Sequence, residues 1–250
     1  MKEIKRCTWP GIDPLYIKYH DEEWGKITHD DHKLFEFLVL ESAQAGLSWI
    51  TILRRRENYR KAYADFDVHK VAAFDEEDVQ RLLHDEGIIR NRLKVASSIS
   101  NAKLFIEVQK EFGSFDKYLY SFMPDEKPII NQPGPIPAST PISDAISKDM
   151  KKRGFKFFGT TICYAHMQAT GMVNDHLADC SFKWFLIFVI LRNEGSIRVL
   201  LIIMWPSCCI IDASFLSMTK AFLVRFLISL NQHKSYFWST RFNLITEKSV

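Results

Sequence analysis

The sequence has little that would place it in a membrane or in an oxidising compartment. Its N-terminal stretch, MKEIKRCTWPG, is polar and lacks the apolar core of a secretory signal. Only five of its 250 residues are cysteine. We therefore expect a reducing compartment, where a cysteine is more often a metal ligand or a buried apolar residue than half of a disulfide.

Apolar runs long enough to cross a membrane are also missing. The longest, FLIFVIL, VLLIIMWPSCCII and AFLVRFLISL, are 7, 13 and 10 residues long, against the roughly 20 that a spanning helix needs. They lie in 183–250 and show neither a clean helical nor a clean strand period. We interpret this tail as poorly ordered or not native to the fold, and we expect no membrane contact through it. A membrane or partner anchor is the alternative.

An excess of positive charge is absent from residues 1–182, which carry 25 Lys and Arg against 27 Asp and Glu. Residues 183–250 carry eight Lys and Arg against three Asp and Glu. Bulk charge in the first part therefore gives no sign of nucleic-acid binding, and any such function must depend on local basic clusters.

Alternating strand patterns are absent before residue 180, and apolar residues recur there at helical spacing. Ser48 and Asp75 are suited to begin helices, and Gly46, Gly87 and Gly113 to end them in a left-handed conformation. Six of the nine prolines lie in 124–141, which must be a connector. We predict an all-α domain over 1–182. Its expected helices are 32–45, 49–66, 76–87, 91–113, 142–154 and 160–171.

Four side chains suited to zinc lie in two distant pairs. Cys7 and His20 are near the N-terminus, and His176 and Cys180 follow after about 155 residues, a separation unlike that of a zinc finger. Such a site would join two ends of a domain. Because protein side chains would fill all four positions, it would be structural rather than catalytic. The alternative is two plain buried cysteines and two surface histidines.

Aromatic residues gather beside a carboxylate in the first fifty residues. Trp9, Tyr16, Tyr19 and Trp49 could stack on a flat heteroaromatic ring. Glu41 lies in the apolar stretch FLVLESAQAGLSW, where a buried carboxylate without a partner is costly and usually has a function. The alternative is that these aromatics are core. Trp9, Tyr16 and Tyr19, however, lie in a turn-rich segment that we expect to be poor scaffolding for a core.

A basic link joins the last two expected helices, in KKRGFKFFGTTIC. Gly154 and Gly159 allow close approach of a ligand to the backbone, and the N–H groups that begin the second helix can receive a phosphate. The alternative is an ordinary helical hairpin with a solvated basic face. The residues that would face DNA phosphates are Lys151, Lys152, Arg153, Gly154, Lys156 and Gly159.

Several long stretches together resemble one family. DPLYIKYHDEEWG, ESAQAGLSWITILRRRENYR, GIIRNRLKV and KKRGFKFFGTTICYAHMQATGMVNDH are similar to DNA-3-methyladenine glycosylase I, the constitutive bacterial enzyme. The resemblance runs from Cys7 to about Cys180. Two departures stand out: the link differs from the more usual LPGVG, and family members generally end soon after the second zinc cysteine.

The resemblance implies a helix-hairpin-helix glycosylase fold with a structural Zn²⁺ joining its ends. It places the zinc ligands at Cys7, His20, His176 and Cys180. It makes Glu41 the base-recognition and catalytic carboxylate, with Tyr19 as its hydrogen-bonding partner. Trp9, Tyr16 and Trp49 become the walls of the base pocket.

The implied reaction is hydrolysis of the N-glycosidic bond of 3-methyladenine in double-stranded DNA, after base flipping. We expect a monofunctional enzyme, because no lysine stands out as a Schiff-base nucleophile, and we assign Asp175 no catalytic role. We also expect a monomer. A bacterial source would place it in the cytoplasm with the nucleoid, and a eukaryotic one in the nucleus. The alternative function is a catalytically silent, zinc-containing DNA-binding module.

Overall fold

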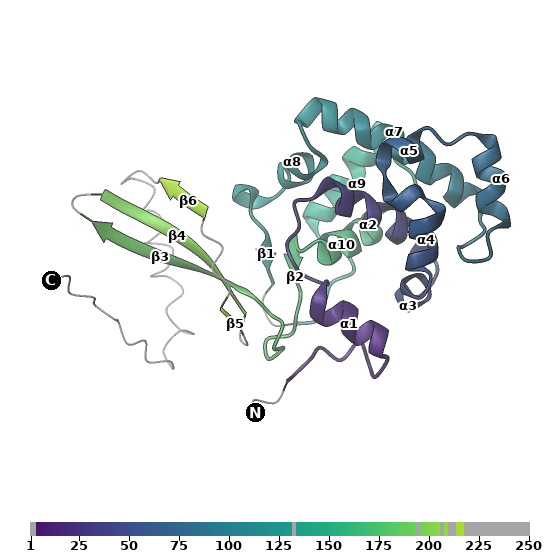
Figure 1. Cartoon of the computed structure of the whole chain (residues 1–250). Coiled ribbons are helices and arrows are strands. Elements are labelled where there is room, and N and C mark those ends of the chain that lie inside the picture. The colour runs from purple at the N-terminus through teal and green to yellow at the C-terminus, as the bar shows by residue number, and fades with distance from the viewer. Residues whose placement is uncertain (1–3, 132–133, 194–195, 206–207, 210–213, 218–250) are drawn as a thin grey trace. The chain divides into compact units, whose positions relative to one another are not determined.

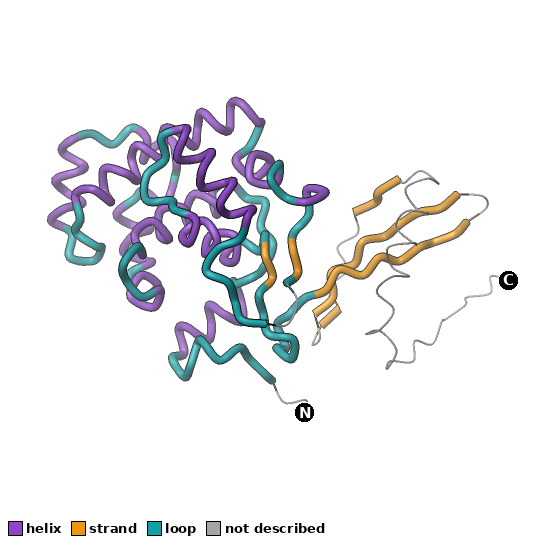
Figure 2. The backbone as a smooth tube through the Cα atoms, turned by 180° about the vertical axis from the view of Figure 1, so that it is seen from behind, coloured by secondary structure: helices purple, strands orange, loops and turns teal. Residues whose placement is uncertain are grey.

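The computed structural model describes residues 4–131, 134–193, 196–205, 208–209 and 214–217. The chain divides into two compact units. One comprises residues 1–184 and 205–207, and the other comprises 185–204 and 208–250. The first unit is mostly helical, whereas the described part of the second consists of strands (Figures 1 and 2).

Helix α1 (Pro14–Glu22) occupies the segment that the sequence analysis expected to be turn-rich. That expectation was wrong because Pro14 stands at the start of the helix, where its fixed φ suits the first turn and its missing N–H costs nothing. Asp13 completes the start by accepting hydrogen bonds from the backbone N–H groups of Leu15 and Tyr16. The two site tyrosines therefore stand on a helix rather than in a turn.

Helix α2 (Asp31–Gln44) is buried on nearly all sides, with an unbroken run of buried residues from 34 to 43. It packs against α3 (Trp49–Leu53), α7 (Arg92–Phe112), α8 (Phe115–Tyr120) and α10 (Thr160–Ala169). A helix enclosed in this way carries any polar side chain into the protein interior. The predicted stop is confirmed, since Gly46 follows in a left-handed conformation with φ of 80°.

The helix expected over 49–66 is broken into three pieces. They are α3, α4 (Arg56–Ala62) and the 3₁₀ turn η1 (Ala64–Phe66). All three residues of η1 have positive φ, which no regular helix accommodates. Helix α5 (Val68–Ala72), which the sequence analysis did not anticipate, begins from Asp67, whose side chain accepts from two backbone N–H groups.

The next two helices agree largely with the prediction. Asp75 begins α6 (Glu76–His84) with a reciprocal capping box, but the helix ends before Gly87, which is not left-handed. The predicted stop there was wrong, and the turn at Asp85 ends the helix instead. Helix α7 ends as predicted at Gly113, whose φ is 86°.

The proline-rich connector contributes the 3₁₀ turn η2 (Pro124–Glu126) and a short strand, β1 (Ile129–Ile130). That strand pairs in parallel with β2 (Val173–Asn174), so the first unit is mostly helical rather than purely α (Figure 2). Between them, α9 (Pro141–Arg153) and α10 form the helical hairpin that the sequence predicted.

The second unit contains an antiparallel pair, β3 (Phe185–Asn193) and β4 (Ser196–Trp205), with β5 (Cys208–Cys209) and β6 (Ser214–Ser217) alongside β4. The apolar runs there contain many branched residues, which suit strands but leave no alternating pattern to detect. The interpretation of 183–250 as poorly ordered or not native to the fold stays a prediction. The run AFLVRFLISL lies outside the described residues. Among the described helices, none combines the length and apolarity required to span a membrane.

Candidate functional site

A cavity of about 250 Å³ opens between α1, the end of α2, the start of α3 and α10. It contains all five residues predicted to recognise the base, together with Trp24 and Gln44 from the same two segments. Three lining residues were not anticipated, because they come from distant segments whose sequence carries no local signal. The lining residues are Trp9, Tyr16, Tyr19, Trp24, Glu41, Gln44, Trp49, Ile136, Ala165 and Gln168.

Glu41 is the only carboxylate among these lining residues, and its side chain is 3% exposed. Helix α2 places it there, one turn before the helix ends. Its Oε2 atom has no hydrogen-bond partner among the described residues. Burial raises the pKa of Glu41 to about 8, because the charged form loses its hydration without gaining a partner. A ligand that offers a positive charge or an N–H group would supply what this carboxyl lacks.

The aromatic residues of the cavity contact one another in edge-to-face and tilted arrangements. Trp9 lies with its ring centroid 4.9 Å from that of Tyr16 and 4.9 Å from that of Trp24. Tyr19 lies 5.4 Å from Trp49. The indole N–H groups of Trp9 and Trp49 have no hydrogen-bond partner among the described residues. A flat ring that entered the cavity would therefore meet both π faces and unused donors.

The Glu41 carboxylate affects its tyrosine neighbours. Burial, and next the nearby Glu41, raise the pKa of both Tyr16 and Tyr19. Both hydroxyls therefore remain protonated at neutral pH and are available as hydrogen-bond donors. The cavity thus combines neutral donors with one acidic group.

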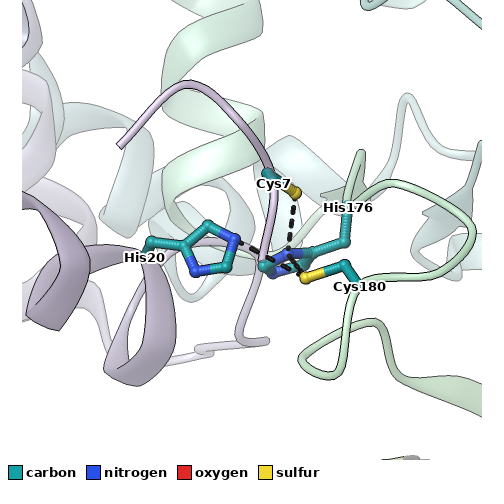
Figure 3. A group of neighbouring side chains, drawn as sticks. All are labelled: Cys7, His20, His176 and Cys180. Carbon is teal, nitrogen blue, oxygen red and sulfur yellow. Dashed lines mark hydrogen bonds between the residues drawn. The ribbon is translucent and has the colours of Figure 1, made fainter. Parts of the chain in front are cut away.

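The four predicted metal ligands converge in a second place (Figure 3). Cys7 precedes α1, His20 is in its last turn, and the other pair lies in the loop after β2. Their ligand atoms all lie within 4.8 Å of one another, and all four residues are buried. Both histidines are buried, so the surface histidines of the alternative interpretation are contradicted. The cluster could hold a metal ion.

In each histidine of the cluster, one ring nitrogen donates a hydrogen bond to an acceptor outside the cluster. His20 donates from Nδ1 to Asp21 at 2.7 Å, and His176 donates from Nε2 to the carbonyl of Trp24 at 3.0 Å. The remaining nitrogens, His20 Nε2 and His176 Nδ1, face the Cys180 sulfur at 3.6 and 3.4 Å. This arrangement is typical of metal-binding histidines, whose second nitrogen is fixed by an outer acceptor.

One thiol of the cluster is stabilised as a thiolate, the form that binds metals. A hydrogen bond from the Cys7 thiol is the main cause that lowers the pKa of Cys180, despite the burial of Cys180. The backbone N–H of Leu177 also donates to the Cys7 sulfur at 3.3 Å. The donor set of two sulfurs and two imidazole nitrogens fits a tetrahedral ion such as zinc.

The basic link between α9 and α10 is a tight turn with an exposed surface. Gly154 is left-handed, with φ of 104°, and Gly159 precedes the first turn of α10 without a capping side chain. The side chains of Lys151, Lys152 and Lys156 are exposed. Free backbone N–H groups at a helix start beside three lysines can receive a phosphate.

Arg153 differs from these lysines. Its guanidinium pairs with Glu111 at 2.6 Å and Asp149 at 2.7 Å, and it lies over the rings of Phe112 and Tyr118. It therefore holds the end of α9 against α7 and α8. Of the predicted phosphate-facing side chains, it alone is already paired.

A family model described as methyladenine glycosylase matches residues 9–184. The chain belongs to the methyladenine glycosylase family. DNA-3-methyladenine glycosylase 1 of Escherichia coli K12 is 52% identical over 180 residues, which are 71% of this chain and 96% of that protein. The DNA-3-methyladenine glycosylase of Haemophilus influenzae is 45% identical over 181 residues, 71% of this chain and 97% of that protein.

Solved structures of this family have the same fold as the first unit. A crystal structure of 3-methyladenine DNA glycosylase I matches with a TM-score of 0.68 and 53% identity, covering 70% of this chain and 98% of that one. A structure described as the basis of 3-methyladenine recognition by the Staphylococcus aureus enzyme matches with a TM-score of 0.69 and 34% identity. It covers 73% of this chain and 98% of that one.

Proposed function

We propose that this protein is a DNA-3-methyladenine glycosylase, which removes N3-methylated adenine from alkylated double-stranded DNA. The observation that carries the proposal is the buried Glu41 carboxyl, which has an unpaired oxygen and lies in an aromatic cavity. The family membership and the relatives' named activity support the same conclusion.

The chemistry of the cavity suits this substrate. An N3-methylated adenine still attached to deoxyribose carries a positive charge, which the Glu41 carboxyl can balance. The pKa of about 8 keeps Glu41 largely protonated in the empty cavity at neutral pH. A cationic base favours the ionised form, so binding and ionisation promote each other. A neutral adenine would gain much less, and the cavity would therefore select the damaged base.

The reaction is a hydrolysis in which the base leaves with the electrons of its bond to the sugar. Water forms a bond to C1′ as the C1′–N9 bond breaks, the base becomes neutral, and the water releases one proton to solvent. The protein has to flip the nucleotide, stack the base between aromatic rings and stabilise its charge. The described lining residues include no lysine, which supports hydrolysis by water rather than a Schiff base with strand cleavage.

The test is release of 3-methyladenine from methylated duplex DNA by the wild type and by Glu41→Gln, both loaded with zinc. Glutamine keeps the size of the side chain but cannot balance the base's charge. We expect release by the variant to fall by about tenfold to a hundredfold, the value of a charge-assisted hydrogen bond. Equal release by both proteins would remove Glu41 from the mechanism. No release by either would refute the activity.

The second part of the proposal is a structural zinc held by Cys7, His20, His176 and Cys180. The convergence of these ligands and the outer acceptors on both histidines support it. Because protein side chains supply four ligands, the ion would hold α1 and the loop after β2 together rather than activate water.

The third part is that α9, the link and α10 are the DNA-binding helix-hairpin-helix. Lys151, Lys152 and Lys156 would face phosphates beside the start of α10, with Gly154 and Gly159 allowing the close approach. Arg153, paired with two carboxylates, would hold the hairpin in place. A DNA substrate would place the protein with the chromosome, which is cytoplasmic in a bacterium. We further propose that it acts as a monomer.

The domain boundary predicted after residue 182 stays a proposal. Lys183 and Trp184 are buried and belong to the first unit: Lys183 donates to the carbonyls of Asn131 and His176, and Trp184 to that of Gly25. A shortened chain for activity measurements should therefore end after Trp184 rather than before it. The alternative, a catalytically silent DNA-binding module, predicts duplex binding by the wild type with no release of base.

A further inference from the structure

A buried carboxylate that the proposed mechanism does not use lies behind the base cavity. Asp175 is 5% exposed and accepts hydrogen bonds from three side chains. Its Oδ2 atom accepts from the Tyr164 hydroxyl at 2.7 Å and from the Gln168 amide nitrogen at 2.7 Å. Its Oδ1 atom accepts from the Asn131 amide nitrogen. With three donors around it, the carboxylate has a defined orientation.

One of these three donors belongs to the cavity. Gln168 lies in the last full turn of α10 and lines the same cavity as Glu41. Its backbone is fixed as well, since its carbonyl accepts from the N–H of Gly25 at 2.9 Å. Both the side chain and the backbone of Gln168 are therefore held in place at the cavity.

The chemistry of Asp175 decides which way the Gln168 amide faces. A carboxylate can only accept hydrogen bonds, so the amide nitrogen must point toward it. The amide oxygen is the atom that remains, and it receives no hydrogen bond from any described residue. Asp175 thus leaves Gln168, which lines the cavity, with its amide oxygen as the group available to a ligand.

We propose that Gln168 is a specificity-determining residue of the base cavity and that Asp175 is the residue that positions it. The inference rests on the proposed function and extends it from the charge of the base to its identity. Adenine carries an amino donor where guanine carries a carbonyl acceptor. An acceptor held in the cavity favours the adenine edge, and a guanine edge would leave two acceptors facing each other.

The test measures quenching of tryptophan fluorescence in the full-length protein by free 3-methyladenine and free 3-methylguanine. Three tryptophans line the cavity and supply the signal. The ratio of the two dissociation constants reports base preference independently of overall affinity. Gln168→Met keeps the length of the side chain and removes the acceptor. Asp175→Asn can donate to the Gln168 oxygen, which lets the amide turn and present its nitrogen to the base.

We expect Gln168→Met to reduce the ratio that favours 3-methyladenine about fivefold, which corresponds to one neutral hydrogen bond. The reduction should come mainly from weaker binding of 3-methyladenine. Asp175→Asn should reduce the ratio at least as much. The matched control is Tyr164→Phe, which removes a different hydrogen bond to Asp175 and should leave the ratio within about twofold, because the Gln168 amide keeps its orientation.

An unchanged ratio in Gln168→Met overturns the proposal. That variant decides it alone if Asp175→Asn folds poorly by circular dichroism, because Gln168 is only half-buried. A reduced ratio in Gln168→Met with a wild-type ratio in folded Asp175→Asn overturns the positioning role of Asp175. A wild type that neither binds nor releases 3-methyladenine refutes the proposed function itself, and this is seen before any variant is compared.

Discussion

Glu41 is a cavity residue whose ionisation depends strongly on folding. In the unfolded chain its carboxyl has an ordinary pKa near 4.5, and burial raises the pKa to about 8 in the folded protein. The folded state therefore binds a proton more tightly than the unfolded state. The contribution of Glu41 to the free energy of unfolding is full below about pH 4.5 and is lost progressively as the pH rises toward 8.

This gives a prediction for Glu41→Gln that is separate from activity. Above pH 4.5 the folded wild type must either bury a charged Glu41 or keep it protonated, and both lower its stability relative to the unfolded chain. Glutamine cannot ionise, so the variant has neither cost. We expect its free energy of unfolding, relative to wild type, to rise between pH 5 and pH 8 by up to about 4 kcal/mol. Urea unfolding of both proteins at several pH values measures the difference. Parallel pH curves would show that Glu41 ionises normally in the folded protein.

At the scale of elements, the hairpin of α9 and α10 carries the proposed contact with DNA. Each lysine that pairs with a phosphate displaces a condensed counterion, so its loss should weaken binding to all sequences alike. We expect Lys152→Ala and Lys156→Ala each to lower the slope of log affinity against log salt by about 0.9. Fluorescence anisotropy of a labelled duplex at several salt concentrations measures this slope.

The matched control for the lysine variants is Lys70→Ala. Lys70 is an equally charged, exposed lysine on α5, paired only with Asp67 within its own helix start. Its removal should leave the salt slope unchanged, because α5 is separate from the hairpin. A similar decrease for all three variants would indicate diffuse electrostatic attraction rather than a site at the hairpin.

The side chain of Asn101, on α7, holds the hairpin link by two hydrogen bonds to the backbone of Lys156. Its buried amide donates to the carbonyl of Lys156 at 2.9 Å and accepts from the N–H of the same residue at 2.9 Å. Asn101→Ala removes both bonds. We expect it to lower the free energy of unfolding by about 1 to 3 kcal/mol and to weaken DNA binding although no charge is lost.

A second variant at this position separates geometry from stability. Asn101→Asp keeps the acceptor for the Lys156 N–H and loses the donor to its carbonyl, so we expect an intermediate effect on DNA binding. Anisotropy and urea unfolding of the same preparations give both quantities. Normal DNA affinity in a destabilised Asn101→Ala protein would show that the link needs no support from α7.

The helices that the sequence predicted well are those with both an apolar period and a capping residue at each end. Helix α7, predicted over 91–113, is such a case, because Asn91 caps its start and Gly113 its end. Helix α1 was not predicted because Pro10, Gly11 and Pro14 are typical of turns, although Pro14 stands where a helix tolerates it. The second break within 49–66, after α4, involves positive φ at three non-glycine residues, which no local pattern shows.

For the molecule as a whole, the sequence predicted most of the candidate site because its residues lie in a few short segments. The convergence of Cys7 and His20 with His176 and Cys180 could be proposed from ligand chemistry and from resemblance, and the structure brings them together. Gln168 could not be predicted, since it reaches the cavity only through the packing of α10 against α2. Its orientation by Asp175 depends on a fold that brings α10 and the loop after β2 together.

Removal of the metal tests whether the two ends of the first unit are joined as proposed. A zinc ion bound by residues about 155 apart in the sequence would add its binding energy to folding, because the unfolded chain has no formed site. We expect the purified protein to contain one zinc per chain. Chelation should lower its melting temperature, and Cys7→Ser or Cys180→Ser should reduce the zinc content to near zero.

The cysteine variants should be strongly non-additive, because the metal can be lost only once. The double variant Cys7→Ser/Cys180→Ser should therefore be about as stable as either single variant. The control is Cys163→Ser, in which a buried cysteine outside the cluster is changed; it should cost about 1 to 3 kcal/mol and leave zinc content intact. Additive losses for Cys7 and Cys180, with no zinc in the wild type, would mean that the two residues stabilise the fold as buried thiols alone.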